Sequence, residues 1–261
     1  MRALVFCMMC CLSLLHVPTA IATQEVRVGG YHFPPYVERP ESSQPQGLVP
    51  DLLQALNATQ QRYRFVLVPT SAPRRYRDLE NGRFDLMFFE SSTWGWQGRS
   101  YLALDLNVDD AEVFVAAAQP GRGQEYFQDL SDKRMALYHG YHYRFAGFNA
   151  DPDHLVRNYN AMLTYSHDSN LLMLLAQRAD VAVVTRSYLQ MFLDRHPALV
   201  PELLVSAQAD QLYHHQILLR RGGPLKPAQI GELLRQLKGS GEFSRLLDRY
   251  HLTLIDKESG R

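Results

Sequence analysis

The sequence predicts an α/β protein made of two lobes. Strand and helix patterns alternate from residue 26 to residue 89, which is typical of a parallel sheet with right-handed crossovers. A second alternation starts near residue 135, and a last strand precedes two closing helices. We therefore expect the middle of the chain to form a second lobe that is inserted into the first.

The first alternation combines apolar runs with residues that break regular structure. Four prolines make residues 31–46 a stiff loop, because proline fixes φ and lacks a backbone donor. Pro50 stands where the first turn of a helix tolerates proline, and Asn81-Gly82 ends a second, shorter helix. The expected elements are strand 26–30, helix 50–61, strand 65–68, helix 74–80 and strand 84–89.

The second alternation follows an apolar, β-like run at 113–118. Asp168-Ser169 is expected to cap a leucine-rich helix, and Gly239-Ser240-Gly241 separates the last two helices. The expected elements are strands 135–138, 181–184 and 216–219 and helices over 171–175, 187–195, 227–238 and 242–250.

Composition excludes several classes of protein. Lys and Arg number 27 against 27 Asp and Glu, so the net charge is zero and the basic surface of a nucleic-acid binder is not expected. With 46% hydrophobic and 11% aromatic residues, the chain is too apolar to remain disordered. No nucleic-acid partner is expected.

Residues 1–22 have the pattern of a secretory signal peptide. Arg2 precedes an apolar run that ends at Leu15, and Ala20-Ile21-Ala22 fits a cleavage site, so we expect cleavage after Ala22. A lipid anchor and a retained membrane anchor are the less favoured alternatives. All three cysteines lie in this segment, so the mature chain would have no disulfide, cysteine nucleophile or thiolate metal site. The sequence thus predicts export to the periplasm.

Four stretches spread over nearly all of the mature chain carry a family pattern. They are Val26-Arg27-Val28-Gly29 with Phe33-Pro34-Pro35-Tyr36, then the 79–87 run LENGRFDLM, its counterpart at 174–183, LLAQRADVAV, and the ending at 234–250. In this order the four stretches resemble the periplasmic solute-binding proteins of family 3, the polar amino-acid type.

The resemblance implies the two-lobed, type II periplasmic-binding-protein fold. A ligand cleft would lie between the lobes and close by hinge motion. Lobe 1 is expected at 23–113 and 216–261 and lobe 2 at 114–215, with crossings near Val113–Ala116 and Tyr213–Ile217.

The sequence departs from the family pattern at the residues that would contact the ligand. Amino-acid-binding members usually offer a Thr and, three residues later, an Arg that grips the ligand carboxylate. Thr93 is present here, but Trp96 stands at the Arg position, with Arg99 nearby as a substitute. Thr185 stands where an Asp usually holds the ligand ammonium. The resemblance therefore does not imply an ordinary zwitterionic amino acid as the ligand.

The positions that the resemblance assigns to the cleft are mainly aromatic and polar. Such a surface suits a ring-bearing or polar solute through stacking and cation–π contact, and Glu90 is a partner for a cationic group. The candidates for ligand binding are Phe33, Phe89, Glu90, Ser92, Trp94, Trp96, Arg99, His142, Tyr143 and Thr185.

Other charged residues are expected to serve the structure. Arg74, Arg75 and Arg77 predict a solvated helix face, with one arginine pointing into the cleft as the alternative. Asp85 and Asp180 are expected to serve the structure, by ending turns and by capping, rather than to touch a ligand. The histidines at positions 139, 142, 214 and 215 fit no established metal-ligand spacing, so neither a metal nor another cofactor is expected.

The predicted function is therefore solute binding, by a monomer without enzymatic activity. The resemblance implies an inner-membrane ABC permease as partner and a role in amino-acid transport. A free-standing sensor that signals to a membrane protein is the first alternative. The second is a small-molecule lyase, dehydratase-like, that uses the same cleft.

Overall fold

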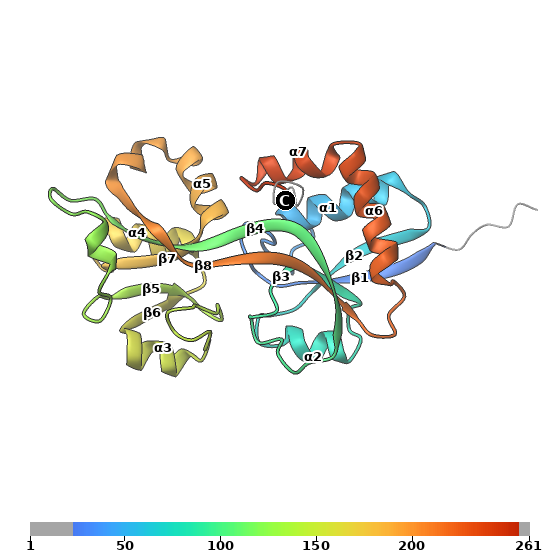
Figure 1. Ribbon diagram of the computed structural model, residues 1–261, viewed down its shortest axis with the longest axis horizontal. Coiled ribbons are helices and arrows are strands. Elements are labelled where there is room, and N and C mark those ends of the chain that lie inside the picture. The colour runs from blue at the N-terminus through green and yellow to red at the C-terminus, as the bar shows by residue number, and fades with distance from the viewer. Residues whose placement is uncertain (1–22, 256–261) are drawn as a thin grey trace, which may run out of the picture.

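Two lobes lie side by side and are joined by a pair of long strands (Figure 1). The structure is a computed structural model that describes residues 23–255. The signal peptide is predicted in residues 1–22, which lie outside the described residues. None of the helices between residues 23 and 255 combines the length and apolar character needed to cross a membrane.

The first lobe contains the beginning and the end of the described chain. Its elements are β1 (Gln24–Gly30), α1 (Leu48–Thr59), β2 (Tyr63–Pro69), α2 (Arg75–Glu80), β3 (Leu86–Glu90), α6 (Pro227–Gly239) and α7 (Glu242–Arg249). The second lobe contains the 3-10 helices η1 (Gln124–Phe127) and η2 (Pro197–Glu202), β5 (Met135–Tyr138), α3 (Pro152–Tyr159), β6 (Ala161–Thr164), α4 (His167–Leu175), β7 (Val181–Thr185) and α5 (Arg186–Arg195). The strands β4 (Tyr101–Ala117) and β8 (Leu203–Arg220) belong to both lobes.

One sheet runs through the whole described molecule. Its eight strands follow the order β2-β1-β3-β8-β4-β7-β5-β6. β1 and β2 are parallel in the first lobe, and β5 is parallel to β6 and β7 in the second. β4 and β8 pair antiparallel over most of their length, and each also pairs with a strand of one lobe only. The predicted two-lobed α/β fold is confirmed.

β4 is longer than the sequence pattern indicated. We expected an apolar run from residue 113, whereas the strand begins at Tyr101. The first half was missed because its carboxylates interrupt the apolar pattern. Val113, Phe114 and Val115 pair with β7, so this part of β4 already lies in the second lobe. The lobe limits at residues 113 and 216 stay a prediction, and the pairing favours a first limit a few residues earlier.

Two further elements escaped the pattern, and one helix begins elsewhere. α3 and β6 were not expected, although Asp151-Pro152 carries a helix-start signal: the Asp151 side chain accepts from the backbone N–H of His154. The expected cap of α4 at Asp168-Ser169 was wrong. Ser166 is the N-cap, and its hydroxyl accepts from the backbone N–H of Ser169 at 3.1 Å.

Each lobe fixes its first strand through an aspartate. Asp85 accepts the backbone N–H and the guanidinium of Arg27 at 3.0–3.2 Å, and Arg220 on β8 donates to it at 2.8 Å. In the second lobe Asp180 accepts the backbone N–H and the guanidinium of Arg134 at 2.8–2.9 Å. Both aspartates therefore have a structural role, as predicted, but they fix the first strand of each lobe through an arginine instead of capping an element.

Replacing Asp85 should destabilise the protein more than replacing Asp180. The Asp85 side chain is 3% exposed and the Asp180 side chain 29%, so water compensates less for the loss at Asp85. Asp85→Asn should lower the free energy of unfolding by about 2–3 kcal/mol, and Asp180→Asn by about 1 kcal/mol or less. Urea unfolding at pH 7 measures the free energy of unfolding of both variants. Equal losses of stability would contradict the larger structural contribution assigned to Asp85.

The same pair of proteins tests the pH dependence. Burial by itself would raise the pKa of Asp85, but the hydrogen bonds from Arg27 and Arg220 outweigh it and lower the pKa. The stabilisation by Asp85 is therefore present above the unfolded-state value of about 4 and is lost as the pH falls below it. The difference between wild type and Asp85→Asn should shrink below about pH 4.

Candidate functional site

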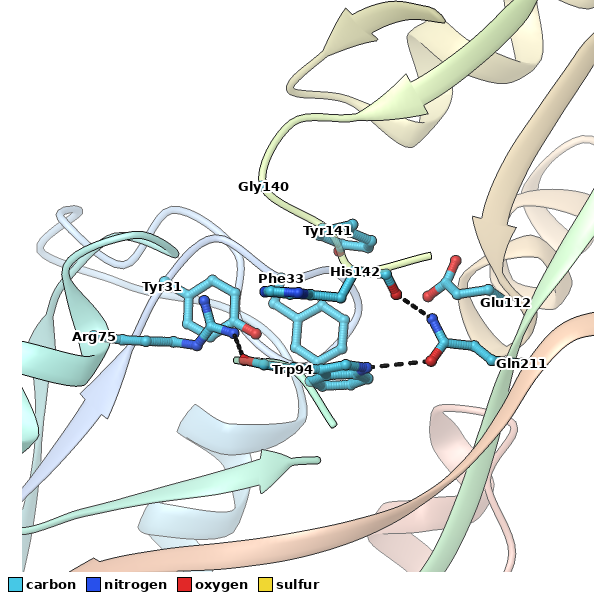
Figure 2. Close-up of a pocket in the computed structure, with 9 residues that line it drawn as sticks. All are labelled: Tyr31, Phe33, Arg75, Trp94, Glu112, Gly140, Tyr141, His142 and Gln211. Carbon is cyan, nitrogen blue, oxygen red and sulfur yellow. Dashed lines mark hydrogen bonds between the residues drawn. The ribbon is translucent and has the colours of Figure 1, made fainter. Parts of the chain in front are cut away.

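A small, partly open cavity lies where the two lobes meet (Figure 2). Its volume is about 10 Å³, which is room for roughly one water molecule. The first lobe supplies residues from the loop after β1, from α2 and from the loop after β3, and the second lobe supplies the loop after β5. The lining residues are Tyr31, Phe33, Arg75, Trp94, Glu112, Gly140, Tyr141, His142 and Gln211.

Aromatic rings form the walls of this cavity. The Phe33 ring stands at 90° to Trp94 and at 82° to Tyr141, with centroid distances of 5.6 and 5.5 Å. Tyr31 stacks on Phe33 at 5.6 Å. Because Phe33 and Trp94 belong to the first lobe and Tyr141 to the second, the walls are complete only when the lobes are closed.

The proline-rich loop holds Phe33 in place. Phe33 and Val37 form an isolated antiparallel bridge, and the backbone N–H of Tyr36 donates to the Phe33 carbonyl at 2.8 Å. The Tyr36 ring stacks on Phe33, with centroids 4.5 Å apart. The stiff loop predicted from the prolines thus presents one aromatic ring to the cavity.

Two polar contacts join the lobes beside the rings. Gln211 on β8 accepts from the Trp94 indole N–H at 3.3 Å and donates through its amide to the His142 carbonyl. The Tyr76 hydroxyl lies 3.1 Å from Nε2 of His142 and donates to the Trp94 carbonyl at 2.7 Å. Gln211 and Tyr76 each contact both Trp94 and His142, and so connect these two residues across the cleft.

Burial disfavours the charged form of His142. Its Nδ1 lies 2.7 Å from the Phe148 carbonyl, which only accepts, so Nδ1 carries the proton and Nε2 faces Tyr76. Burial lowers the pKa of His142 to about 4; the bond to Phe148 opposes this change, and the charge of Arg75 adds to it. Acid therefore works against closure at this residue.

Arg75 contributes a buried positive charge that is already balanced. It is 2% exposed, and its Nε lies 3.3 Å from Oε2 of Glu90. Its terminal nitrogens donate to the carbonyls of Ala72 and, at 3.0 Å, Trp94. Trp96 donates its indole N–H to the same Glu90 oxygen at 2.6 Å. Burial raises the pKa of Glu90, while the charge of Arg75 and the Trp96 bond oppose that rise.

A second buried network connects the lobes near the crossing strands. The Tyr36 hydroxyl and the Ser187 hydroxyl each donate to Oδ2 of Asp110 at 2.6 Å. Nε2 of His215 lies 2.6 Å from the Tyr36 oxygen and so donates to it. Tyr36 comes from the first lobe and Ser187 from α5 of the second, so the carboxylate on β4 ties both lobes at the crossing.

The structure distributes the residues predicted from the sequence over three environments. Phe33, Trp94 and His142 line the cavity. Glu90, Trp96 and Thr185 lie one contact away, through Arg75 or Glu112. The rest lie elsewhere: Phe89 and Tyr143 are buried in the core, Ser92 is exposed, and Arg99 donates to Glu80 at the surface.

Several lining residues were not predicted as ligand-binding. The alternative interpretation of the helix at 74–80 was that one arginine points into the cleft, and Arg75 does line the cavity. Tyr31 directly follows β1 and stands two residues before the predicted Phe33. Glu112 and Gln211 were missed because the strand pattern of 113–118 left out the polar half of β4, and β8 was expected only from residue 216. The pairing of Glu112 with Gln211 across the two long strands brings them to the cleft.

Comparison with solved structures identifies the fold. A binding component of an ABC transporter from Wolinella succinogenes complexed with lysine matches at a TM-score of 0.67 and 17% identity, covering 90% of this chain and 97% of that one. An ABC uptake transporter substrate-binding protein from Streptococcus pneumoniae with bound histidine matches at 0.67 and 17%, covering 87% and 92%. The chain has the two-lobed periplasmic-binding-protein fold.

The same fold also occurs in a signalling protein. A histidine kinase sensor domain with similarity to periplasmic binding proteins matches the chain at a TM-score of 0.62 and 19% identity, covering 89% of this chain and 99% of that one. No family model and no curated protein matches the sequence. The predicted resemblance is thus confirmed at the level of the binding-protein fold.

The lowered pKa of His142 predicts a pH dependence of stability. Its pKa is about 4 in the folded protein against about 6.5 in the unfolded chain, so its contribution is complete above pH 6.5 and is lost as the pH falls toward 4. The free energy of unfolding should fall less steeply between pH 6.5 and 4 in His142→Gln than in wild type. Urea unfolding across this range measures it.

Leu212→Gln on the same strand as Gln211 is the control for that comparison, because Leu212 is 70% exposed and has no titratable group. It should follow the wild-type curve. A His142→Gln curve parallel to wild type would show that closure does not depend on the charge of His142.

Proposed function

We propose that the chain is an exported solute-binding protein that holds a small polar or aromatic solute between its lobes, with an ABC importer as its partner. The observation that carries this proposal is a cavity whose walls come from both lobes of a binding-protein fold. A site of this kind exists only in the closed form, so binding and closure depend on each other.

The solute must enter while the lobes are apart. A volume of about 10 Å³ admits no organic solute, and the protein's own side chains fill the space. Separating the lobes breaks the contacts of His142 with Gln211 and Tyr76. The freed donors and acceptors, together with the Trp94 indole, are then available to a solute.

The walls favour a solute with a flat or ring-shaped part. Phe33 and Trp94 on one side and Tyr141 on the other offer ring faces and edges at distances suited to aromatic contact. Two similar binding proteins carry histidine and lysine, which supports amino acids and their derivatives as the first solutes to test.

A sensor is the second candidate function. The likeness to a histidine kinase sensor domain supports it, because that sensor domain has the same kind of fold. Uptake of the identified solute by cells with and without the gene separates the two roles. A dehydratase-like lyase would consume the solute, so recovery of the unchanged solute after incubation would exclude that alternative for the solute tested.

A thermal-shift screen of refolded mature protein tests binding directly. Refolding removes any solute carried through purification. At least one class among amino acids, amines, aromatic acids, peptides and sugars should raise Tm by several degrees, because a ligand of the folded state stabilises it by mass action. Trp94→Phe, which removes the N–H to Gln211, should weaken binding of that solute about tenfold.

Phe192→Leu is the matched control, because Phe192 is a buried aromatic residue of the second-lobe core outside the cavity lining. It should lower Tm yet leave the dissociation constant within about twofold, a change of about 0.4 kcal/mol. Equal weakening by both variants would mean that Trp94 acts through stability alone. No shift with any class would contradict the proposed function.

A further inference from the structure

Glu112 is a buried carboxyl at the wall of the cavity with one oxygen unused. The residue is 2% exposed and lies in the middle of β4. Its Oε1 accepts from the Thr185 hydroxyl at 3.0 Å and from the Tyr213 hydroxyl at 3.3 Å. Its Oε2 is buried and has no hydrogen-bond partner among residues 23–255. In Figure 2 the carboxyl group lies beside the His142 carbonyl and the Gln211 amide at the cavity.

The second-lobe end of the cavity has an excess of negative groups. Asp110 and Asp210 lie near enough to raise the pKa of Glu112 by their charge. Asp110 accepts from hydroxyls and backbone N–H groups, and Asp210 accepts from the backbone N–H groups of Arg144 and Phe145, with the charge of Arg144 near enough to lower its pKa. No ion pair of Glu112 occurs within the described chain.

The one positive side chain among the lining residues is committed elsewhere. Arg75 pairs with Glu90 inside the first lobe, and all three of its nitrogens make hydrogen bonds. A buried carboxyl without a cation is unfavourable unless it is neutralised or receives a positive partner. The missing charge at Glu112 is therefore not supplied by the protein side chains that line the cavity.

The aromatic walls have the geometry that an organic cation requires. Phe33 stands nearly perpendicular to both Trp94 and Tyr141, and all three rings line the same space. Ring faces attract ammonium groups, and the attraction increases when water is excluded, as it is in a closed cleft. Since Tyr141 and Glu112 are contributed beyond the first lobe, this set of groups comes together on closure.

We propose that the bound solute carries an ammonium group and that Glu112, through Oε2, is the residue that selects for it. This inference rests on the proposed function and adds the chemical class of the solute. The rings of Phe33, Trp94 and Tyr141 surround the cation while the carboxylate balances its charge. Solutes of the same shape without a positive charge leave the carboxyl unpaired and bind weakly.

Binding of a cation should release a proton. Burial raises the pKa of Glu112 well above its usual range, and the charges of Asp110 and Asp210 add to the increase, while Thr185 and Tyr213 oppose it. A cation at Oε2 favours the ionised form and lowers the pKa again. Affinity should therefore rise with pH. The titratable groups that face Glu112 are Asp110, Tyr141, Tyr143, Asp210 and Tyr213, with His167 next to its partner Thr185.

The experiment compares each cation with a neutral molecule of the same shape by isothermal titration calorimetry of the mature protein. The pairs are tyramine with 4-ethylphenol, cadaverine with 1,5-pentanediol and choline with 3,3-dimethyl-1-butanol. Any amino acid found in the screen is paired with its desamino analogue. The cation of the tightest pair should bind at least about 30-fold more tightly than its neutral partner.

Glu112→Gln keeps the shape and removes the charge, so it should abolish most of this preference, a loss of about 30-fold for the cation. Asp109→Asn, an acid-to-amide change on the same strand whose side chain is 35% exposed, is the control and should change affinity less than twofold. If Glu112→Gln does not fold, the wild type alone decides. Titrations in phosphate and in Tris should show proton release, with affinity increasing from pH 5 to pH 8.

The outcomes separate the inference from the function on which it rests. Two results would overturn the role of Glu112 and leave the binding function standing. One is that the solute that binds most tightly has no positive charge. The other is that Glu112→Gln binds the cation within threefold of wild type while Trp94→Phe still weakens binding. In wild type, pH-independent affinity without proton release also overturns it. Binding of no solute at all overturns both.

Discussion

The antiparallel pairing of β4 with β8 is the constraint on which the rest of the structure depends. Both strands run through the two lobes, and between residues 105 and 113 their registers fix which side chains meet at the crossing. Glu112 lies opposite Gln211 on one side and opposite Thr185 of β7 on the other. A shift of one residue would turn these side chains to the other face of the sheet, so the site exists only in this register.

The polar contacts between the lobes are of two kinds. The contacts of His142 with Gln211 and Tyr76 join lobe to lobe across the cavity and must break when the cleft opens. The contacts of Asp110 with Tyr36 and Ser187 lie at the crossing of the two long strands. A hydrogen bond contributes about 1 kcal/mol net to stability. The free energies of the closed form without solute and of the solute-bound form therefore differ by the exchange of only a few hydrogen bonds.

The sequence predicted the fold well because most of its elements are indicated by residues that are close together in the sequence. Apolar runs, glycine stops and a repeated aspartate motif predicted β1, β5, β7 and most helices, and the aspartates act in both lobes as expected. The site was predicted less completely. Phe33 and Trp94 were found from their positions in the resemblance, whereas Glu112 has no local signal. Its role depends on strand pairing between residues about 70 to 100 positions apart.

Thr185 illustrates what a position-by-position comparison misses. The sequence suggested that a carboxylate had been lost at the end of β7. In the structure the Thr185 hydroxyl donates to Glu112 on the neighbouring strand, so a carboxyl group lies in the same region from another position in the chain. Arg99 was considered as a substitute for a missing arginine, whereas the buried guanidinium at the cavity is that of Arg75, which lies on α2 rather than on the loop that carries Arg99.

The most direct test of a site that forms only on closure is the distance between the lobes. The described chain has no cysteine, so Arg77→Cys on α2 and Arg157→Cys on α3, both exposed, give one spin label on each lobe. Double electron–electron resonance should give a broad or two-peaked distance distribution without solute and a single, shorter distance with the solute identified by the screen. One unchanged distance in both conditions, with binding established, would contradict closure around a solute.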